Sequence, residues 1–535
     1  MLLITSAEYI SQEFASEVGL LPPSMLPIAN KRLYQLQFDL LKDYKGDKFL
    51  SLPKSFKLNA FDERELHKLG VKVLWVPSNI SLAESILYCW NSTGKFYKEL
   101  KILHGDTLFT DINLSIKDCI SVHKNDGFYP RATISLDTFI VGERLWASKD
   151  DLVASGYFSF SQPATFIKNI LDSNHNFESA VKTYTDKQKI EILTNGVWYD
   201  FGHLNSYFRS RAQMTTQRAF NQLHISEFSV EKYSDQHKKI EAESNWFCSI
   251  PYSIKSYTPN LINPKIYSSD NKRGYSLEYL YLLTLNDLYV FSKLTIAEWK
   301  FIFSTLNLML RKFSKIKKTF TEYDKATAES LYLDKTLRRL NAFSGQHPPV
   351  IKDRYYVATL GKKVSLEEIA KHTANFIGKV NEERFCFIHG DLCFSNIFFD
   401  FRSHNLKLID PRGIDEKGKS SVYGDQRYDV AKLYQSFVGG YDFIIAGRYS
   451  ISLSAEDAPK IEIYSDLPLS ELRELFVKEV IAKFGYSEIE ILAITIHLFI
   501  SMLPLHYDSE EKQKAFVFNV YRLFNWFVQM EQELS

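Results

Sequence analysis

The sequence predicts two domains of different fold class, an α/β domain with a mixed sheet followed by an α+β domain of two lobes. At 535 residues, the chain is too long for one hydrophobic core. Strand-like runs alternate with helix-like stretches over the first part, the rhythm of a sheet with parallel strands. Short strands and a largely helical end follow. We expect domain borders that give residues 1–212 for the α/β domain and 213–288 and 289–535 for the two lobes.

The first domain contains four short apolar runs. These runs are expected to be strands, and they lie at residues 2–6, 48–52, 71–76 and 101–103. In the second domain, residues 228–234 alternate between apolar and polar side chains, as a half-buried strand does. Residues 236–247 have helical character, and residues 275–280 resemble another strand.

Composition narrows the class of protein. The 65 basic and 64 acidic residues nearly cancel, so no global field would attract nucleic acid or an anionic membrane. The five cysteines lack C-x-x-C spacing, which favours reduced core residues of a cytosolic protein. The longest apolar run, 491–505, is shorter than the roughly 20 residues that span a bilayer. We therefore expect a cytoplasmic protein without membrane insertion or a nucleic-acid partner.

The most informative segment is residues 389–396, H-G-D-L-C-F-S-N, with Asp410 fourteen residues after Asn396. Apolar residues on both sides predict a strand, a tight loop and another strand, and a further strand ends at Asp410. Phosphoryl transfer from ATP needs a carboxylate to orient and deprotonate a hydroxyl, and an amide and a second carboxylate to hold Mg²⁺. The spacing of five from Asp391 to Asn396 matches the kinase catalytic loop. The alternative is a set of turn residues between buried strands.

This segment resembles the aminoglycoside phosphotransferase and choline kinase branch of the protein-kinase-like fold, in which Gly or a small residue replaces the Arg of H-R-D. Residues 424–433, G-D-Q-R-Y-D-V-A-K-L, resemble the stretch that follows the magnesium-binding Asp in that family. The resemblance implies that Asp391 is the catalytic base and that His389 shapes the loop. It also implies that Asn396 and Asp410 bind Mg²⁺ and that ATP is the phosphate donor.

A nucleotide-binding lobe should precede this loop. Lys232 is a candidate phosphate-binding residue, and Glu241 or Glu243 could pair with it; the alternative is an exposed Lys and two surface Glu residues. In the family, a strand such as 275–280 is the hinge that binds adenine through its backbone, which assigns Glu278 and Leu280 to the nucleotide. No glycine-rich loop precedes Lys232, where residues 218–223 read R-A-F-N-Q-L. Its absence fits the small-molecule branch better than protein kinases.

The helical end normally builds the acceptor site in this family. His506 and Asp508 follow an apolar helix and are candidates to line that site; a helix terminus with satisfied hydrogen bonds is the alternative. Tyr441 and Asp442 are similar candidates. Periodicity does not identify the acceptor.

Two Asp residues in the first domain lie at strand ends, where α/β sheets bind ligands. Asp106 ends L-H-G-D, and Asp200 lies in W-Y-D-F-G-H. Ordinary turn residues are the alternative. The two motifs resemble the G-D and W-x-D-x-G motifs of sugar-phosphate nucleotidyltransferases, which implies that Asp106 and Asp200 bind Mg²⁺. Residues 156–160 resemble the strand that contacts the sugar phosphate in that family.

The first domain also departs from that family. Residues 5–9, T-S-A-E-Y, replace its glycine-rich loop, and Pro23 stands where its catalytic Lys should be. Loss of that Lys removes charge stabilisation of the departing pyrophosphate, unless Lys31 or Arg32 compensates. Two alternatives stay open: transfer from ATP, CTP or another nucleoside triphosphate, or a sugar-nucleotide-binding fold without transfer.

Together the halves resemble bacterial capsule and lipopolysaccharide precursor enzymes. That resemblance implies a kinase that acts on a small hydroxylated acceptor and is joined to a nucleotidyltransferase-like domain. Together they would prepare an activated sugar, polyol or amino-alcohol precursor. The alternatives are a kinase with a non-catalytic first domain, an antibiotic-modifying phosphotransferase, and a scaffold of two decayed enzymes. The sequence leaves the acceptor, the oligomeric state and the order of the two steps open.

Overall fold

The computed structural model describes residues 1–125, 129–135, 140–145, 148, 151–214, 221–268, 270, 272–344 and 351–534. The chain divides into two compact units, Met1–Met214 (unit 1) and Thr215–Ser535 (unit 2). Residues 218–220, part of the segment expected before Lys232, lie outside the described residues. All five cysteines are free thiols.

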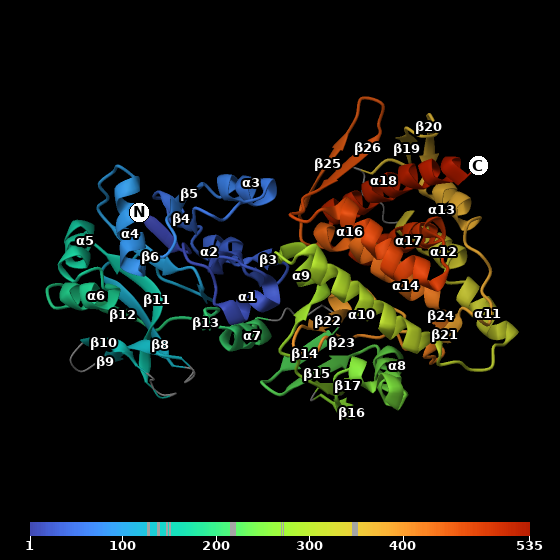
Figure 1. The fold of residues 1–535 in the computed structure, drawn as a ribbon, viewed down its shortest axis with the longest axis horizontal. Coiled ribbons are helices and arrows are strands. Elements are labelled where there is room, and N and C mark those ends of the chain that lie inside the picture. Colours follow the sequence, from blue (N-terminus) through green and yellow to red (C-terminus); the bar gives the residue numbers. More distant parts are fainter. Residues whose placement is uncertain are drawn as a thin grey trace. The chain divides into compact units, whose positions relative to one another are not determined.

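Unit 1 is built on a mixed sheet with the strand order β10-β9-β11-β6-β1-β4-β5, and β8 pairs with β11 and with β12 (Figure 1). The pairs β1–β4, β1–β6 and β4–β5 are parallel, whereas β11 is antiparallel to β6. The strands are β1 (Leu2–Thr5), β4 (Lys48–Pro53), β5 (Val71–Val76), β6 (Leu100–His104), β8 (Cys119–Lys124), β9 (Arg131–Ser135), β10 (Ile140–Leu145), β11 (Leu152–Phe160) and β12 (Glu191–Leu193). The four predicted parallel strands thus lie side by side, with the carboxyl ends of β1 and β6 together.

Helices connect these strands because parallel neighbours need crossover connections. They are α1 (Gln12–Val18), α2 (Leu33–Leu40), α3 (Ala60–Lys68), α4 (Leu82–Ser92), α5 (Pro163–Asp172), α6 (Phe177–Thr185) and α7 (Leu204–Gln213). Helix α4 begins at a capping box in which Ser81 and Glu84 bond each other's backbone N–H groups. Apolar residues of α4, α5 and α6 share one core with the sheet, including Ile102 and Phe158.

Short elements complete the edge of unit 1 that carries the candidate site. A 3₁₀ turn (Pro23–Met25) precedes a small hairpin of β2 (Pro27–Ile28) and β3 (Lys31–Arg32). Strand β7 (Thr107–Phe109) pairs with β13 (Trp198–Asp200) in antiparallel register, with Thr107 opposite Asp200. This register brings the two predicted Asp residues to the same place.

Unit 2 begins with an antiparallel sheet in the order β14-β15-β17-β16. Its strands are β14 (Asn221–Ile225), β15 (Ser229–Ser234), β16 (Leu261–Tyr267) and β17 (Arg273–Glu278). Helix α8 (His237–Cys248) contacts β16 and β17, and a 3₁₀ turn (Tyr252–Tyr257) follows it (Figure 1). This small lobe positions Lys232 on β15 opposite Tyr275 on β17.

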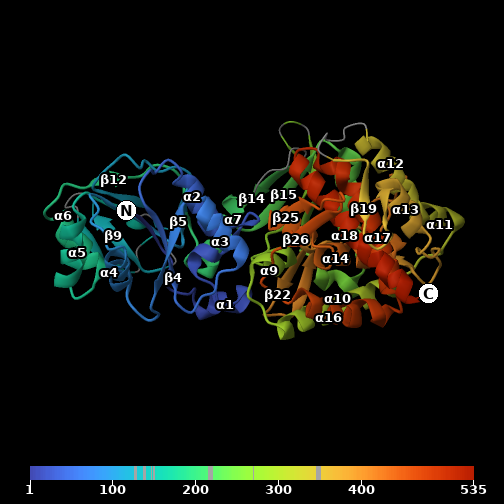
Figure 2. The same cartoon turned by 90° about the horizontal axis from the view of Figure 1, so that it is seen from above.

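The larger lobe is mostly helical (Figure 2). Its helices are α9 (Leu285–Phe291), α10 (Ile296–Ser314), α11 (Glu322–Glu329), α12 (Leu333–Ser344), α13 (Leu366–Ala374), α14 (Gln426–Phe437), α15 (Tyr441–Ile445), α16 (Leu469–Phe476), α17 (Glu488–Met502) and α18 (Glu510–Leu534). Helix α17 contacts α12, α13, α14 and α18. Among the described residues, Glu488–His506 is the one helical stretch long and apolar enough to cross a membrane, and 83% of it is buried inside the fold.

Short strands frame the predicted catalytic loop. Strands β18 (Leu283–Thr284), β22 (Ile397–Asp400) and β23 (Asn405–Leu408) form one small sheet, and β21 (Phe385–Phe387) pairs with β24 (Tyr423–Asp425). The loop therefore runs from β21 to β22 through a 3₁₀ turn (Phe394–Asn396). The expected helical end also contains a hairpin of β25 (Tyr449–Leu453) and β26 (Pro459–Ile463). A second hairpin, of β19 (Arg354–Val357) and β20 (Lys362–Ser365), precedes α13.

Candidate functional site

The loop after β21 is fixed by a carboxylate from α14. The backbone N–H groups of His389 and Gly390 donate to the two carboxylate oxygens of Asp429, at 2.7 and 2.8 Å. Burial raises the pKa of Asp429 to about 7, although these two hydrogen bonds act in the opposite direction. Gly390 has a φ of 79°, and a Cβ there would lie 2.7 Å from the Cβ of Arg412. A glycine is therefore required at this turn.

His389 links the loop to the strand that precedes Asp410. Its Nε2 lies 2.9 Å from the backbone oxygen of Ile409, and its Nδ1 accepts from the Asp391 N–H at 3.3 Å. Burial lowers the pKa of His389 to about 4, so the ring is neutral with its proton on Nε2. His389 therefore links the loop to Ile409 through one ring nitrogen and to Asp391 through the other.

Asp391 faces a lysine that the sequence analysis did not identify. The Nζ atom of Lys432 lies 3.0 Å from Asp391 Oδ1, and 42% of the Asp391 side chain is exposed. Burial raises the pKa of Asp391, but the charge and hydrogen bond of Lys432 outweigh burial and hold that pKa below its usual range. Asp391 is thus held in its ionised form with its carboxylate partly exposed. Lys432 follows Asp429 by three residues on one helix, a spacing that places both on one face.

Asn396 and Asp410 lie at the two ends of the segment that carries β22 and β23. Asn396 Nδ2 donates to the Asp391 backbone oxygen at 2.9 Å, and Ile409 N donates to the Asn396 backbone oxygen at 3.0 Å. These bonds tie both residues to the loop. Asp410 has a φ of 56°, and 45% of its side chain is exposed. An amide oxygen and an accessible carboxylate are the oxygen ligands that Mg²⁺ takes from proteins, so the two residues fit this ion.

Lys232 joins the small lobe to Asp410. Its Nζ lies 2.7 Å from Glu243 Oε2 and 3.0 Å from Asp410 Oδ1. Burial lowers the pKa of Lys232, but the charges of Asp410 and Glu243 outweigh burial and raise it above its ordinary value. Glu243 also accepts from the Tyr275 hydroxyl at 3.1 Å, whereas Glu241 pairs with Arg273. Of the two candidate partners, Glu243 therefore holds Lys232.

The two residues expected at the nucleotide hinge lie at the end of the small lobe. Glu278 is the last residue of β17, and its Oε2 accepts from Asn260 Nδ2 at 2.6 Å. Leu280 follows in the link to β18 and is half-buried. The expected hinge thus spans the end of one lobe and the start of the next.

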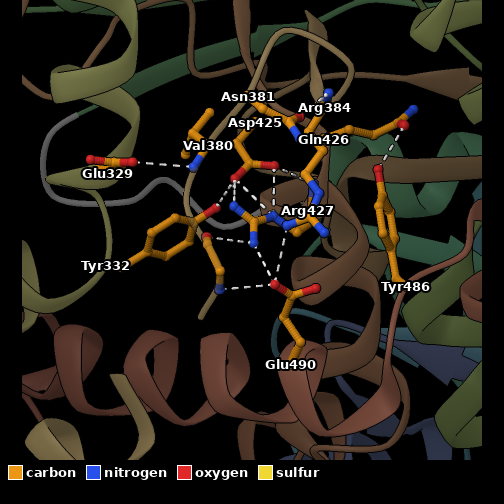
Figure 3. Close-up of polar contacts among 11 residues, drawn as sticks. Glu329, Tyr332, Val380, Asn381, Arg384, Asp425, Gln426, Arg427, Tyr486 and Glu490 are labelled. Carbon is orange, nitrogen blue, oxygen red and sulfur yellow. Dashed lines mark hydrogen bonds and ion pairs between the residues drawn. The ribbon is translucent and has the colours of Figure 1, made fainter. Parts of the chain in front are cut away.

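The motif at the start of α14 contains two Asp residues, Asp425 and Asp429, which have different partners. Asp425 is fully buried and ion-paired with Arg427 at 2.5 Å; Arg427 also reaches Glu490 of α17 at 2.5 Å. Tyr332 donates its hydroxyl to Asp425 at 2.6 Å. Figure 3 shows these side chains closing a network between α14 and α17. Asp425 is structural, therefore, whereas Asp429 shapes the loop around Asp391.

The acceptor candidates at the end of α17 show no common site. His506 is half-buried, with its ring 4.8 Å from that of Phe516, and Asp508 is exposed. Asp442 lies nearer the loop, because it bonds Ser436, whose hydroxyl accepts from the Phe394 N–H at 3.0 Å. Burial raises the pKa of Asp442 to about 8.

In unit 1, the predicted Asp residues converge over one glycine. A Cβ on Gly202 would lie 2.5 Å from Asp106 Oδ2 and 3.3 Å from Asp200 Oδ1. Asp200 Oδ2 is ion-paired with Arg131 Nη2 at 2.6 Å, and the Arg131 guanidinium stacks 4.8 Å from the Trp198 ring. The sequence analysis did not identify Arg131, which lies 69 residues from Asp200.

Two cavities of about 290 and 460 Å³ meet at Asp106. Pro23 lines the larger one. Of the two residues expected to replace the missing Lys, Arg32 is buried and donates to the Met25 backbone oxygen at 2.6 Å, and Lys31 is exposed. Arg32 is therefore committed to the hairpin turn, and neither Arg32 nor Lys31 is among the described residues that line the two cavities.

Comparison with known proteins gave matches in structure alone. No family model and no curated protein matches the sequence. A nucleoside-diphosphate-sugar pyrophosphorylase from Vibrio cholerae RC9 is 13% identical with a TM-score of 0.33, over 39% of this chain and 99% of that one. An inositol-1-phosphate CTP transferase from T. maritima is 12% identical with a TM-score of 0.31, over 41% and 97%. The GDP complex of an aminoglycoside 2'-phosphotransferase is 12% identical with a TM-score of 0.36, over 59% and 92%. Both families that the sequence resembles are among these structures.

Proposed function

We propose that unit 2 is an ATP- and Mg²⁺-dependent phosphotransferase that acts on a hydroxyl group of a small molecule. One observation carries this proposal: the bonds of the loop bring Asp391 with Lys432, Asn396, and the Lys232–Glu243–Asp410 chain into one site. An equivalent set performs each part of phosphoryl transfer in kinases. A set of ordinary turn residues would not need a buried Lys–Glu pair aimed at Asp410.

The residues have distinct roles in this proposal. Asp391 accepts the proton of the acceptor hydroxyl, and Lys432 orients its carboxylate and keeps it ionised. Asn396 and Asp410 hold Mg²⁺, which when bound neutralises charge on the phosphate oxygens. Lys232, positioned by Glu243, contacts the phosphates, and Glu278 and Leu280 lie where adenine would bind. Together they place an ionised base next to the phosphate to be transferred.

The acceptor is proposed to be a sugar, polyol or amino-alcohol precursor for capsule or surface polysaccharide, phosphorylated in the cytoplasm. The alternative of an antibiotic-modifying enzyme is less favoured. Beside the loop, Lys335 and Arg412 are ion-paired with Glu416, and Lys432 is ion-paired with Asp391. A polycationic drug would have to compete with these side chains for the carboxylates. For unit 1, the choice between nucleotidyl transfer and binding without transfer is taken up below.

The test is a screen of hydroxylated metabolites with the purified chain, Mg²⁺ and ATP labelled in the γ-phosphate. We expect transfer of label to at least one acceptor, and a loss of about 10²–10⁴-fold in Asp391→Asn. Asp410→Ala should remove Mg²⁺-dependent ATP binding. Asp353→Asn changes an exposed carboxylate outside the site and is the matched control. Normal turnover in Asp391→Asn would refute the assignment.

A further inference from the structure

The pair of carboxylates in unit 1 already has a cation. Asp106 and Asp200 converge over Gly202, and Arg131 Nη2 lies 2.6 Å from Asp200 Oδ2. The side chains of Arg131 and Asp200 are only 13% and 9% exposed. The Trp198 ring, 4.8 Å from the guanidinium, holds it in place. Arg131 is thus a fixed part of the site.

Two adjacent carboxylates in a half-buried cavity need a positive charge nearby. A Cβ on Gly202 would lie within 3.3 Å of an oxygen of each carboxylate, so the two negative charges lie close together. A divalent metal ion or a protein cation could supply that charge. The guanidinium supplies that charge here on Asp200 Oδ2, whereas Asp200 Oδ1 lies on the side of Asp106.

Within the part of the chain that the structure describes, the cavity walls offer no second lysine or arginine to a nucleoside triphosphate. Among the described residues that line the two cavities, Arg131 is the only lysine or arginine. The same walls carry the carboxylates of Glu8, Asp106, Glu178 and Asp200. Pro23 lines the larger cavity where a lysine was expected. A triphosphate would thus meet mostly negative charge, and pyrophosphate would leave without stabilisation.

We propose that Arg131 is an internal cation that replaces Mg²⁺ at Asp106 and Asp200, so that unit 1 binds no divalent metal there and does not transfer nucleotides. The residues present do not fit the metal that the fold family implies. Unit 1 is then a binding domain whose ligand is held without a metal ion. This inference is independent of the phosphotransferase proposed for unit 2.

The test measures Mn²⁺ binding by electron paramagnetic resonance, in which bound Mn²⁺ loses its free signal. The full chain carries Asp410→Asn, so that a proposed metal ligand of unit 2 is absent from every sample. At roughly millimolar Mn²⁺, we expect Asp106→Asn to leave the amount of bound Mn²⁺ unchanged while Arg131 is present. Arg131→Gln should gain one Mn²⁺ per chain, which Asp106→Asn should abolish. Arg131→Lys, which keeps the charge, is the matched control and should gain none.

Two results of the Mn²⁺ measurement would overturn the proposal. One is Mn²⁺ binding in the chain with Arg131 intact that Asp106→Asn or Asp200→Asn removes. The other is a folded Arg131→Gln chain, judged by circular dichroism, that gains no Mn²⁺. If Arg131→Gln does not fold, Mn²⁺ binding is still compared between the chain with Arg131 intact and the same chain carrying Asp106→Asn. Binding that Asp106→Asn removes would refute the proposal. A second assay offers ATP, CTP and UTP with Mg²⁺ and sugar 1-phosphates: Asp106-dependent pyrophosphate release would also refute the proposal.

Discussion

Asp391 lies beside a lysine from a different element, Lys432 of α14, at 3.0 Å. A carboxylate that must accept a proton is most useful when it stays ionised and keeps one orientation. Lys432 favours both, and it could also stabilise negative charge that develops near Asp391. The motif of residues 424–433 contains Lys432 but does not indicate this contact, because the contact depends on how α14 docks against the loop.

Replacing Lys432 should therefore slow phosphotransfer and shift its pH dependence. In Lys432→Met we expect kcat to fall about 100-fold. The ionised form of Asp391 is the base, so the rate falls as pH drops through its pKa. Because Lys432 keeps that pKa low, its loss should raise the pKa and move the acid limb to higher pH. The measurement is kcat against pH for an acceptor found in the screen.

Lys432→Arg is the matched variant, since it keeps the charge and should keep the position of the acid limb. An unchanged rate and pH profile in Lys432→Met would exclude a role for this lysine at Asp391.

At the scale of elements, α14 organises unit 2. Asp425, Asp429 and Lys432 are spaced by four and three residues, so they lie along one side of the helix. Asp425 caps the helix and binds Arg427, Asp429 holds the loop, and Lys432 reaches Asp391. Arg427 also connects α14 to α17 through Glu490. The position of the catalytic loop thus depends on how one helix is anchored.

Arg427→Ala should therefore destabilise the chain strongly. It leaves the buried carboxylate of Asp425 without its cation and Glu490 with Arg384 alone, which costs about 3–5 kcal/mol. We expect urea denaturation of unit 2 to show a loss of this size. Arg384 also contacts Glu490, at 3.2 Å, but its side chain is 28% exposed. Arg384→Ala is thus the control, with an expected loss of about 1 kcal/mol or less; equal losses would contradict a special role for Arg427.

At the scale of the whole molecule, each unit has its own core and its own candidate site. The site of unit 1 centres on Asp106, Asp200 and Arg131, and that of unit 2 on Asp391 and Asp410. No residue is shared between these two sets. The chemistry proposed for unit 2 therefore needs no side chain from unit 1.

Asp200→Asn should leave phosphotransfer within about twofold of the unaltered chain, because none of the residues proposed to carry phosphotransfer belongs to unit 1. The measurement is the rate of label transfer from ATP at saturating acceptor, with Asp391→Asn as the inactive reference. A large loss in Asp200→Asn would instead mean that the two sites are coupled.

Sequence patterns predicted the strands and the loop whose residues are contiguous in the chain. The parallel strands β1, β4, β5 and β6 were evident because each is an apolar run bounded by polar residues. The loop around Asp391 was evident because its residues are contiguous. Arg131 and Lys432 were missed because their partners are 69 and 41 residues away, and only the docked structure joins them. The hairpin of β25 and β26 was missed because its strands are short and partly exposed, so burial imposes little pattern on them.

The contact between Gly390 and Arg412 also bears on how this sequence can change over time. A side chain at position 390 would be strained by its positive φ and would collide with the Cβ of Arg412, 2.7 Å away. Replacing Gly390 by the arginine of an H-R-D loop would therefore also require the backbone around Arg412 to move. In an alignment of descendants, positions 390 and 412 should vary together, and a lineage that lost the glycine would also have rebuilt the segment after Asp410.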